Sequence, residues 1–159
     1  MFKPASAFAL CLLGLWGLVA HALPAVSPPP APAAVQVRAA ALTARDEKNI
    51  RAVVQGQLDA LARDDADKAF SFAAPNVREA LDTAPRFMDM VQRGYPVVYR
   101  PASVAYLKAE GSRGAAIQRV QMTDQAGEAW LATYTLQRQK SGAWRITGCS
   151  VTDNRGRMT

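Results

Sequence analysis

Apolar residues between Thr43 and Leu61 recur every three or four positions, as they do on one face of an α-helix. Thr43 and Asp46 have the spacing of a capping box, so we expect a helix to begin at Thr43. Gln57 falls on the apolar side of this helix, and a buried amide needs hydrogen-bond partners. We therefore expect Gln57 to reach a polar network or a cavity. The apolar positions are Ile50, Val53, Val54, Leu58 and Leu61.

Three shorter helices are expected to follow. Residues 64–67 carry three carboxylates in four positions, but they lack the ligand series of an EF-hand. We therefore expect one of them to cap a helix over 68–73, with a metal loop as the alternative. Pro75 is suited to the first turn of a helix that continues to Leu81. A further helix is predicted from 83 to 94, where a glycine ends it.

Beyond Gly94 the pattern changes to one typical of β-strands. Residues 95–99 are rich in β-forming types, and Pro96 marks them as an edge or irregular strand. In the last strand the apolar phase slips across Thr147 and Gly148, which predicts a β-bulge. Helices followed by an antiparallel β-meander predict an α+β fold. The other strands are expected at 103–109, 115–123, 128–138 and 143–152, separated by turns.

The N-terminal part of the chain has the pattern of a leader followed by a spacer. Lys3 precedes an apolar run over 8–20, and Ala20-His21-Ala22 offers small residues at both positions of a cleavage site. We expect a signal peptide over 1–22, with an uncleaved membrane anchor as the alternative. Residues 23–42, rich in Pro and Ala, predict an extended spacer. The folded domain would cover 43–153, with a C-terminal tail over 154–159.

Composition adds several exclusions to this picture. The chain has 159 residues, a formal net charge of +6, two cysteines and one histidine. Removal of the leader would take away Cys11 and His21, leaving Cys149 and no histidine. A mature chain of this kind excludes an intramolecular disulfide, histidine ligation of a metal, and Ser-His-Asp or Cys-His catalysis. We expect an exported protein, periplasmic or secreted, with no metal and no cofactor.

The excess of basic over acidic residues, and the way these residues are distributed, indicate which kinds of partner to expect. Lys and Arg are spread along the chain instead of clustered, so no nucleic-acid footprint is indicated. A membrane contact is expected only through an uncleaved leader. The remaining partners are an unknown small molecule or protein, and a second copy of the chain.

Seven short segments of the chain together resemble a known family. They are 57–61, 64–65, 69–75, 87–91, 95–98, 118–120 and 144–149. The family they resemble consists of exported bacterial proteins with a domain of unassigned function, DUF4864. It is similar to the cystatin-like folds, which include nuclear transport factor 2 and ketosteroid isomerase. The resemblance implies a strongly curved sheet that wraps against the helices and leaves a cone-like cavity, and it supplies no catalytic residues.

Five side chains are the candidates for lining such a pocket. Gln118 and Arg145 alternate with apolar neighbours, so they either enter the pocket as amide and cation contacts or lie on a solvated sheet face. Tyr134 is expected in the core with its hydroxyl at the rim. Cys149 is either a small buried residue beside the bulge or a thiol activated by Arg145. Gln57 is the fifth candidate.

Two functions from different classes remain open. The favoured one is a non-catalytic pocket domain that binds a small ligand or a protein partner. The alternative is a cofactor-free isomerase or hydrolase that uses a carboxylate such as Asp89 together with Tyr134, with Tyr106 as a further candidate. A carboxylate is seldom buried unpaired, so Asp89 is expected to face water. A homodimer through the open sheet face is a third possibility for assembly.

Overall fold

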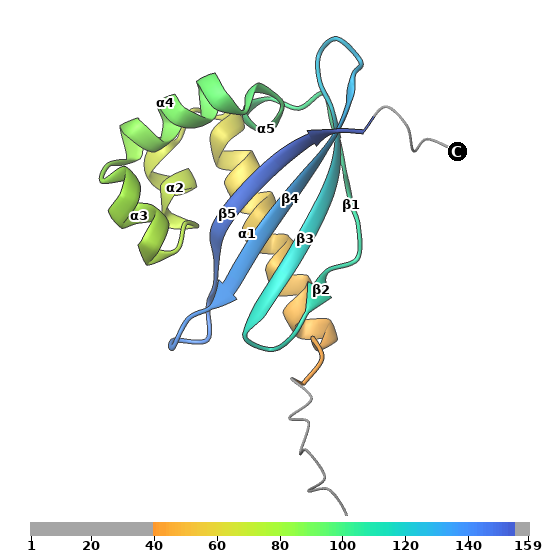
Figure 1. Ribbon diagram of the computed structural model, residues 1–159. Coiled ribbons are helices and arrows are strands. Elements are labelled where there is room, and N and C mark those ends of the chain that lie inside the picture. Colours follow the sequence, from red (N-terminus) through yellow and green to blue (C-terminus); the bar gives the residue numbers. More distant parts are fainter. Residues whose placement is uncertain (1–39, 155–159) are drawn as a thin grey trace, which may run out of the picture. The chain divides into compact units, whose positions relative to one another are not determined.

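The computed structural model describes residues 40–154. The expected signal peptide, nearly all of the spacer and nearly all of the tail lie outside these residues. Within them, helices come first and strands follow, as an α+β fold requires (Figure 1). The helices are α1 (Ala44–Ala62), α2 (Ala66–Ser71), α3 (Pro75–Leu81), α4 (Ala84–Gly94) and α5 (Pro96–Tyr99). The strands are β1 (Ser103–Tyr106), β2 (Glu110–Gly111), β3 (Ala115–Thr123), β4 (Ala129–Arg138) and β5 (Trp144–Asp153).

Helix α1 begins at the capping box that the sequence predicts. The Asp46 N–H donates to Thr43 Oγ1 at 3.1 Å, and the Thr43 N–H donates to Asp46 Oδ2 at 3.2 Å. These bonds satisfy two N–H groups that a helix end leaves without partners. The expected cap of the next helix is also present, because the Lys68 N–H donates to Asp65 Oδ1 at 3.0 Å. Helix α2 lies two residues earlier than its predicted range.

The segment after Gly94 is helix α5, so the predicted strand over 95–99 was wrong. Pro96 lies in the first turn of the helix, where its missing N–H breaks no helical bond. Val97 and Val98 are both buried against the core. Neighbouring residues point to opposite faces of a strand, whereas this helical turn lets both valines pack inward. Tertiary packing therefore overrides their β-propensity.

The strands form one antiparallel sheet in the order β1-β3-β4-β5, and β2 pairs with β3 beside β1. In the register of β4 and β5, Thr135 pairs with Gly148 and Leu136 pairs with Ile146. Thr147 is therefore an extra residue, which confirms the predicted bulge. The bulge brings the later part of β5 back into phase with the core. The strand expected at 103–109 ends early, at Tyr106.

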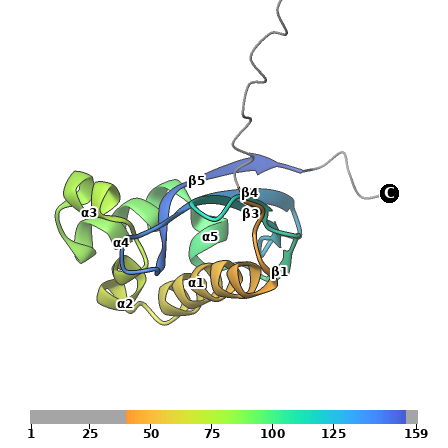
Figure 2. The same ribbon diagram turned by 90° about the horizontal axis from the view of Figure 1, so that it is seen from below.

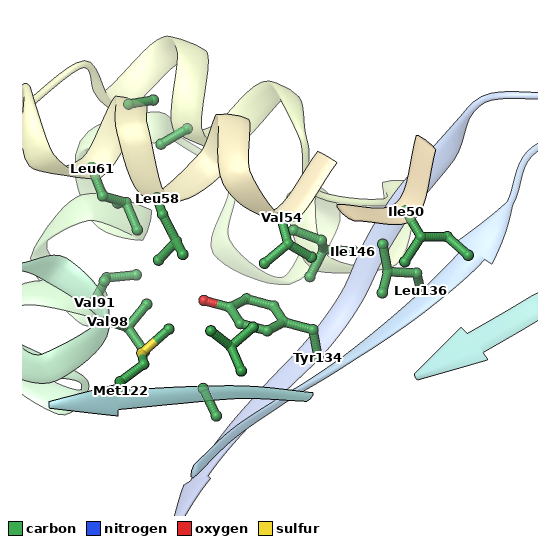
Figure 3. Packing of buried hydrophobic residues seen from close by; sticks show 14 of the residues in the cluster. Ile50, Val54, Leu58, Leu61, Val91, Val98, Met122, Tyr134, Leu136 and Ile146 are labelled. Carbon is green, nitrogen blue, oxygen red and sulfur yellow. The ribbon is translucent and has the colours of Figure 1, made fainter. Parts of the chain in front are cut away.

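The sheet curves, and α1 and α5 contact one of its faces (Figures 1 and 2). In the described part of the chain no helix covers the opposite face (Figure 2). This is the face that the homodimer considered in the sequence analysis would use. The core lies between the helices and the covered face (Figure 3). Its largest fully buried apolar side chains are Ile50, Val54, Leu61, Val120, Met122, Tyr134 and Leu136.

The free edge of β5 is partly closed by the connection between α2 and α3. The Ile146 N–H donates to the Phe72 carbonyl at 2.9 Å, and the Ala74 N–H donates to the Ile146 carbonyl at 2.7 Å. This short parallel bridge lies beside the bulge. The bridge places the end of α2 against β5, so this connection closes one side of the region between the helices and the sheet.

Candidate functional site

A cavity of about 120 Å³ lies between the helices and the covered face of the sheet. Most of its wall is apolar, and it includes residues of α1, α4 and α5 as well as β4 and β5. Three of its lining residues carry polar groups that the sequence singles out. They are Gln57, Tyr134 and Cys149. A second tyrosine, Tyr95, also lines the cavity. The other residues of the wall are Leu61, Ala73, Val77, Phe87, Met90, Val91, Val98, Ile146 and Gly148.

Three of the candidate residues form one row across the inner face of the sheet. Gln118 of β3 pairs with Tyr134 of β4, and Tyr134 pairs with Cys149 of β5. Directly paired residues have neighbouring side chains on the same face of a sheet. The bulge at Thr147 is what sets Cys149 into this row, because without it the phase of β5 would place the thiol on the open face.

Tyr134 is fully buried at the centre of this row. Its ring lies over the sheet, and its hydroxyl extends toward Leu58, Val91 and Val98 (Figure 3). Among residues 40–154 the hydroxyl makes no hydrogen bond of ordinary geometry, although buried polar groups are normally paired. The Cys149 thiol interacts with it, but a thiol is a weak hydrogen-bond partner. Burial raises the pKa of Tyr134 well above its usual range. The side chain is therefore a neutral hydrogen-bond donor aimed into an apolar space.

Gln57 contributes the amide to the cavity wall from α1. Its side chain is buried, and Nε2 donates to the Ala69 carbonyl at 3.3 Å, which holds the amide in place. Its Oε1 is not among the buried side-chain atoms that lack a partner, unlike the Tyr134 hydroxyl.

Cys149 presents a protonated thiol to the same cavity. It is half-buried, and its Sγ lies 3.9 Å from the Ser150 carbonyl. Burial raises the pKa of Cys149 to about 12. A reactive cysteine needs a lowered pKa, so the structure favours the inert interpretation of this residue. Arg145 does not activate it, because Nη1 of Arg145 donates to the Trp144 carbonyl at 2.9 Å and the side chain lines a separate hollow beside Phe72.

Gln118 belongs to the row but turns away from the cavity. Its Nε2 donates to the carbonyls of Leu107 at 2.6 Å and Arg119 at 2.9 Å. It lines a second hollow between α1 and the segment after β1, together with Tyr106. The structure thus brings together Gln57, Tyr134 and Cys149, and it places Gln118 and Arg145 elsewhere.

The carboxylate considered for catalysis is not at the cavity. Asp89 lies on the exposed side of α4, where its carboxylate accepts from Arg93 at 2.8 Å. No Asp or Glu of the described range lines the cavity. Within residues 40–154 no group of three or more His, Cys, Asp and Glu residues has the arrangement of a metal site. Over the same range no helix is both long and apolar enough to cross a membrane.

One group of charged residues escaped the sequence analysis. Lys48 and Arg51 of α1 meet Lys108, which follows β1, at the second hollow. The spacing of Lys48 and Arg51 places them on one helical face, and this was a readable signal. The approach of Lys108 depends on the pairing of β1 with β3, which the local sequence does not reveal.

The family described as a domain of unknown function, DUF4864, matches residues 43–159. The chain belongs to this family. Among solved structures, it is similar to an NTF-2-like protein of unknown function from Silicibacter pomeroyi DSS-3, with a TM-score of 0.51 and 16% identity. The match covers 71% of this chain and 100% of the other.

The chain is also similar to a protein of unknown function with a cystatin-like fold from Nostoc punctiforme PCC 73102. That match has a TM-score of 0.50 and 12% identity, and it covers 72% of this chain and 96% of the other. No curated protein matches the chain. At these identities the likeness establishes the fold, and it confirms the cystatin-like, NTF-2-like architecture expected from the sequence.

Proposed function

We propose that this domain binds a small, largely apolar molecule in the central cavity and holds it through one hydrogen bond from Tyr134. The observation that carries this proposal is the buried Tyr134 hydroxyl, which makes no hydrogen bond of ordinary geometry among residues 40–154 and has the weakly polar Cys149 thiol beside it. A buried polar group left unpaired costs about 1–3 kcal/mol. A ligand atom that accepts from this hydroxyl would remove the cost, so the cavity favours an occupant with one acceptor.

The volume of the cavity limits the size of this ligand. An apolar protein cavity of about 150 Å³ holds a molecule such as benzene. The cavity of this domain measures about 120 Å³, so it suits a single ring or a short chain. A cavity enclosed between α1 and the sheet also favours a small molecule over a protein segment as the ligand.

The polar groups of the wall define the chemistry of recognition. Tyr134 stays protonated because burial raises its pKa, so it donates and brings no negative charge. Gln57 adds an uncharged amide from the helical wall, with its Nε2 already bonded to the Ala69 carbonyl. Burial also raises the pKa of Cys149, so its thiol contributes a polarisable, uncharged surface. A neutral ligand with a hydroxyl or carbonyl group fits this set better than an ion.

The positions of the side chains favour binding over a catalytic mechanism in which a carboxylate and a tyrosine transfer protons. General acid–base catalysis needs the second group within hydrogen-bond reach of the reacting atom. Asp89 is exposed and paired with Arg93, and no described Asp or Glu lines the cavity. Turnover of small molecules that is lost in Asp89→Asn would contradict the proposal.

Phenol and toluene test the proposal because they differ only in a hydroxyl in place of a methyl group. Calorimetric titration of the full-length protein is expected to give tighter binding of phenol, by about tenfold for one added hydrogen bond. Tyr134→Phe should remove this preference while leaving toluene binding nearly unchanged.

Tyr99→Phe is the matched control. Tyr99 is half-buried and lies outside the cavity, where its hydroxyl donates to Asp64. This variant should keep the preference for phenol. Equal binding of phenol and toluene by the unaltered protein, or failure of both to bind, would overturn the proposal.

We propose also that the domain acts outside the cytoplasm, in the periplasm or as a secreted protein. The support for this is the pattern of Lys3, the apolar run over 8–20 and the small residues at 20 and 22. The test is the mass of the protein recovered from its own host. A mature chain that begins at Leu23 is expected, whereas an intact N-terminus in the cytoplasmic fraction would contradict this location.

A further inference from the structure

A second hollow, of about 370 Å³, lies between the first half of α1 and the segment that follows β1. It shares no lining residue with the central cavity. Its wall is dominated by polar and charged groups, unlike the apolar wall of the cavity. The lining residues that matter here are Glu47, Lys48, Arg51, Tyr106, Lys108 and Gln118.

The charges around this hollow are unbalanced. Lys48, Arg51 and Lys108 line it, and Glu47 is the one carboxylate among its lining residues. In the described part of the chain none of the three cations forms a salt bridge. Like charges gathered around a concave surface raise the local concentration of counter-ions. The hollow therefore attracts anions.

Arg51 is held in place without using its donors. Its guanidinium carbon lies 4.7 Å from the centroid of the Tyr106 ring, a cation–π contact. Burial raises the pKa of Tyr106 to about 12, so this ring adds no negative charge. Asp59, the carboxylate that also acts on Tyr106, already accepts from Gln55 at 2.8 Å. The N–H groups of Arg51 remain available to an anion in a rigid fork.

The other two cations are positioned by different elements. Lys48 lies one turn before Arg51 on α1, so both side chains are on the same face of the helix. Lys108 lines the hollow from the segment after β1, where Gln118 Nε2 donates to the carbonyl of the preceding Leu107 at 2.6 Å. The buried Gln118 thus fixes the backbone beside Lys108, which gives this amide a structural purpose outside the central cavity.

We propose that this hollow binds the oxyanion group of a small molecule, a phosphate or a carboxylate, with Lys48, Arg51 and Lys108 as donors. The three cations are exposed side chains that line the same hollow from α1 and from the segment after β1, so a compact oxyanion could contact more than one of them. Charge-assisted hydrogen bonds from Arg and Lys are the usual means of such recognition. The site is independent of the central cavity, so it stands whether or not the cavity binds a neutral ligand.

Titrations of the full-length protein with sodium phosphate, sodium acetate and sodium chloride at constant ionic strength test this proposal. Amide NMR shifts report the site. We expect saturable shifts around Lys48, Arg51 and Lys108 with phosphate or acetate, and none with chloride. Tighter binding of phosphate would identify a phosphate ligand, and tighter binding of acetate a carboxylate ligand.

Arg51→Gln should lower the affinity for the more tightly bound anion by about tenfold or more, as expected for the loss of a charged hydrogen-bond donor. Arg78→Gln is the matched control, because Arg78 is an exposed arginine on α3, away from the hollow. It should leave the affinity unchanged. The proposal would be overturned if phosphate and acetate gave the same shifts as chloride, or if both variants lost the same amount of affinity. Unchanged shifts elsewhere in Arg51→Gln verify that this variant is folded.

Discussion

Tyr134 of β4 and Cys149 of β5 are directly paired across the sheet, and both side chains enter the same cavity. The pairing results from the extra residue Thr147, which shifts the phase of β5 between Ile146 and Cys149. A fully buried hydroxyl that makes no hydrogen bond of ordinary geometry therefore lies next to a thiol that stays protonated and interacts with it only weakly. This arrangement suits a binding cavity and not a nucleophilic centre.

Replacing Tyr134 by Phe is expected to leave the free energy of unfolding unchanged or to raise it by about 1 kcal/mol. The hydroxyl makes no hydrogen bond of ordinary geometry in the described part of the chain, so its removal loses at most the weak interaction with the Cys149 thiol and abolishes a desolvation cost. Urea denaturation without added ligand measures the difference. A loss of about 2 kcal/mol or more would mean that the hydroxyl has a partner in the free protein, such as an ordered water.

Cys149 is expected to react slowly with iodoacetamide in the folded protein. Its pKa is raised to about 12 by burial, so at pH 8 the thiolate fraction is far smaller than that of a free cysteine. Peptide mapping by mass spectrometry follows Cys149 separately from Cys11. Unfolding in urea should restore an ordinary rate, and a folded-state rate equal to the unfolded one would contradict the buried thiol.

Asp46→Asn is expected to destabilise the protein at neutral pH. The Asp46 carboxylate accepts from Thr43 Oγ1 at 2.7 Å and from Trp144 Nε1 at 3.4 Å, so it connects the start of α1 to β5. The bonds from Thr43 are the main cause that lowers the pKa of Asp46, and Trp144 and Arg138 add to the effect. Urea denaturation at pH 7 measures the loss.

The same group predicts how stability depends on pH. Because the pKa of Asp46 is lower in the folded state, its contribution is complete above the ordinary carboxyl pKa and is lost as the pH falls through the folded value. The difference between the unaltered protein and Asp46→Asn should therefore shrink in acid. Glu79→Gln, an exposed change on α3, should show no such effect. A difference that stays constant down to low pH would contradict this role.

Gly111→Ala is expected to destabilise the domain by about 2 kcal/mol or more, a cost typical of a strained backbone. Gly111 has a φ of +136°, and a Cβ there would lie 2.3 Å from the Ala115 carbonyl oxygen. Gly114→Ala is the matched control, because a Cβ at that glycine meets nothing within 4 Å. Thermal unfolding of both variants compares them. Equal melting temperatures would show that the β2 turn tolerates a side chain.

Local patterns in the sequence were sufficient for most of the fold. The capping box of Thr43 and Asp46 and the bulge at Thr147 each depend on a few neighbouring residues, and both were predicted correctly. The segment 95–99 was predicted wrongly, because Val97 and Val98 have β-propensity but are buried by contacts with distant helices and strands. Propensity is weak compared with such burial.

The sequence by itself determined the helical face of α1, the order of helices and strands, and the types of polar residue available to a cavity. Only the tertiary structure decided that Gln57, Tyr134 and Cys149 share one space while Gln118 turns toward the Leu107 carbonyl. Strand register and side-chain direction decide this grouping, and both depend on pairing between segments far apart in the chain. Periodicity along the sequence reveals which face a side chain occupies, but it does not reveal what lies opposite.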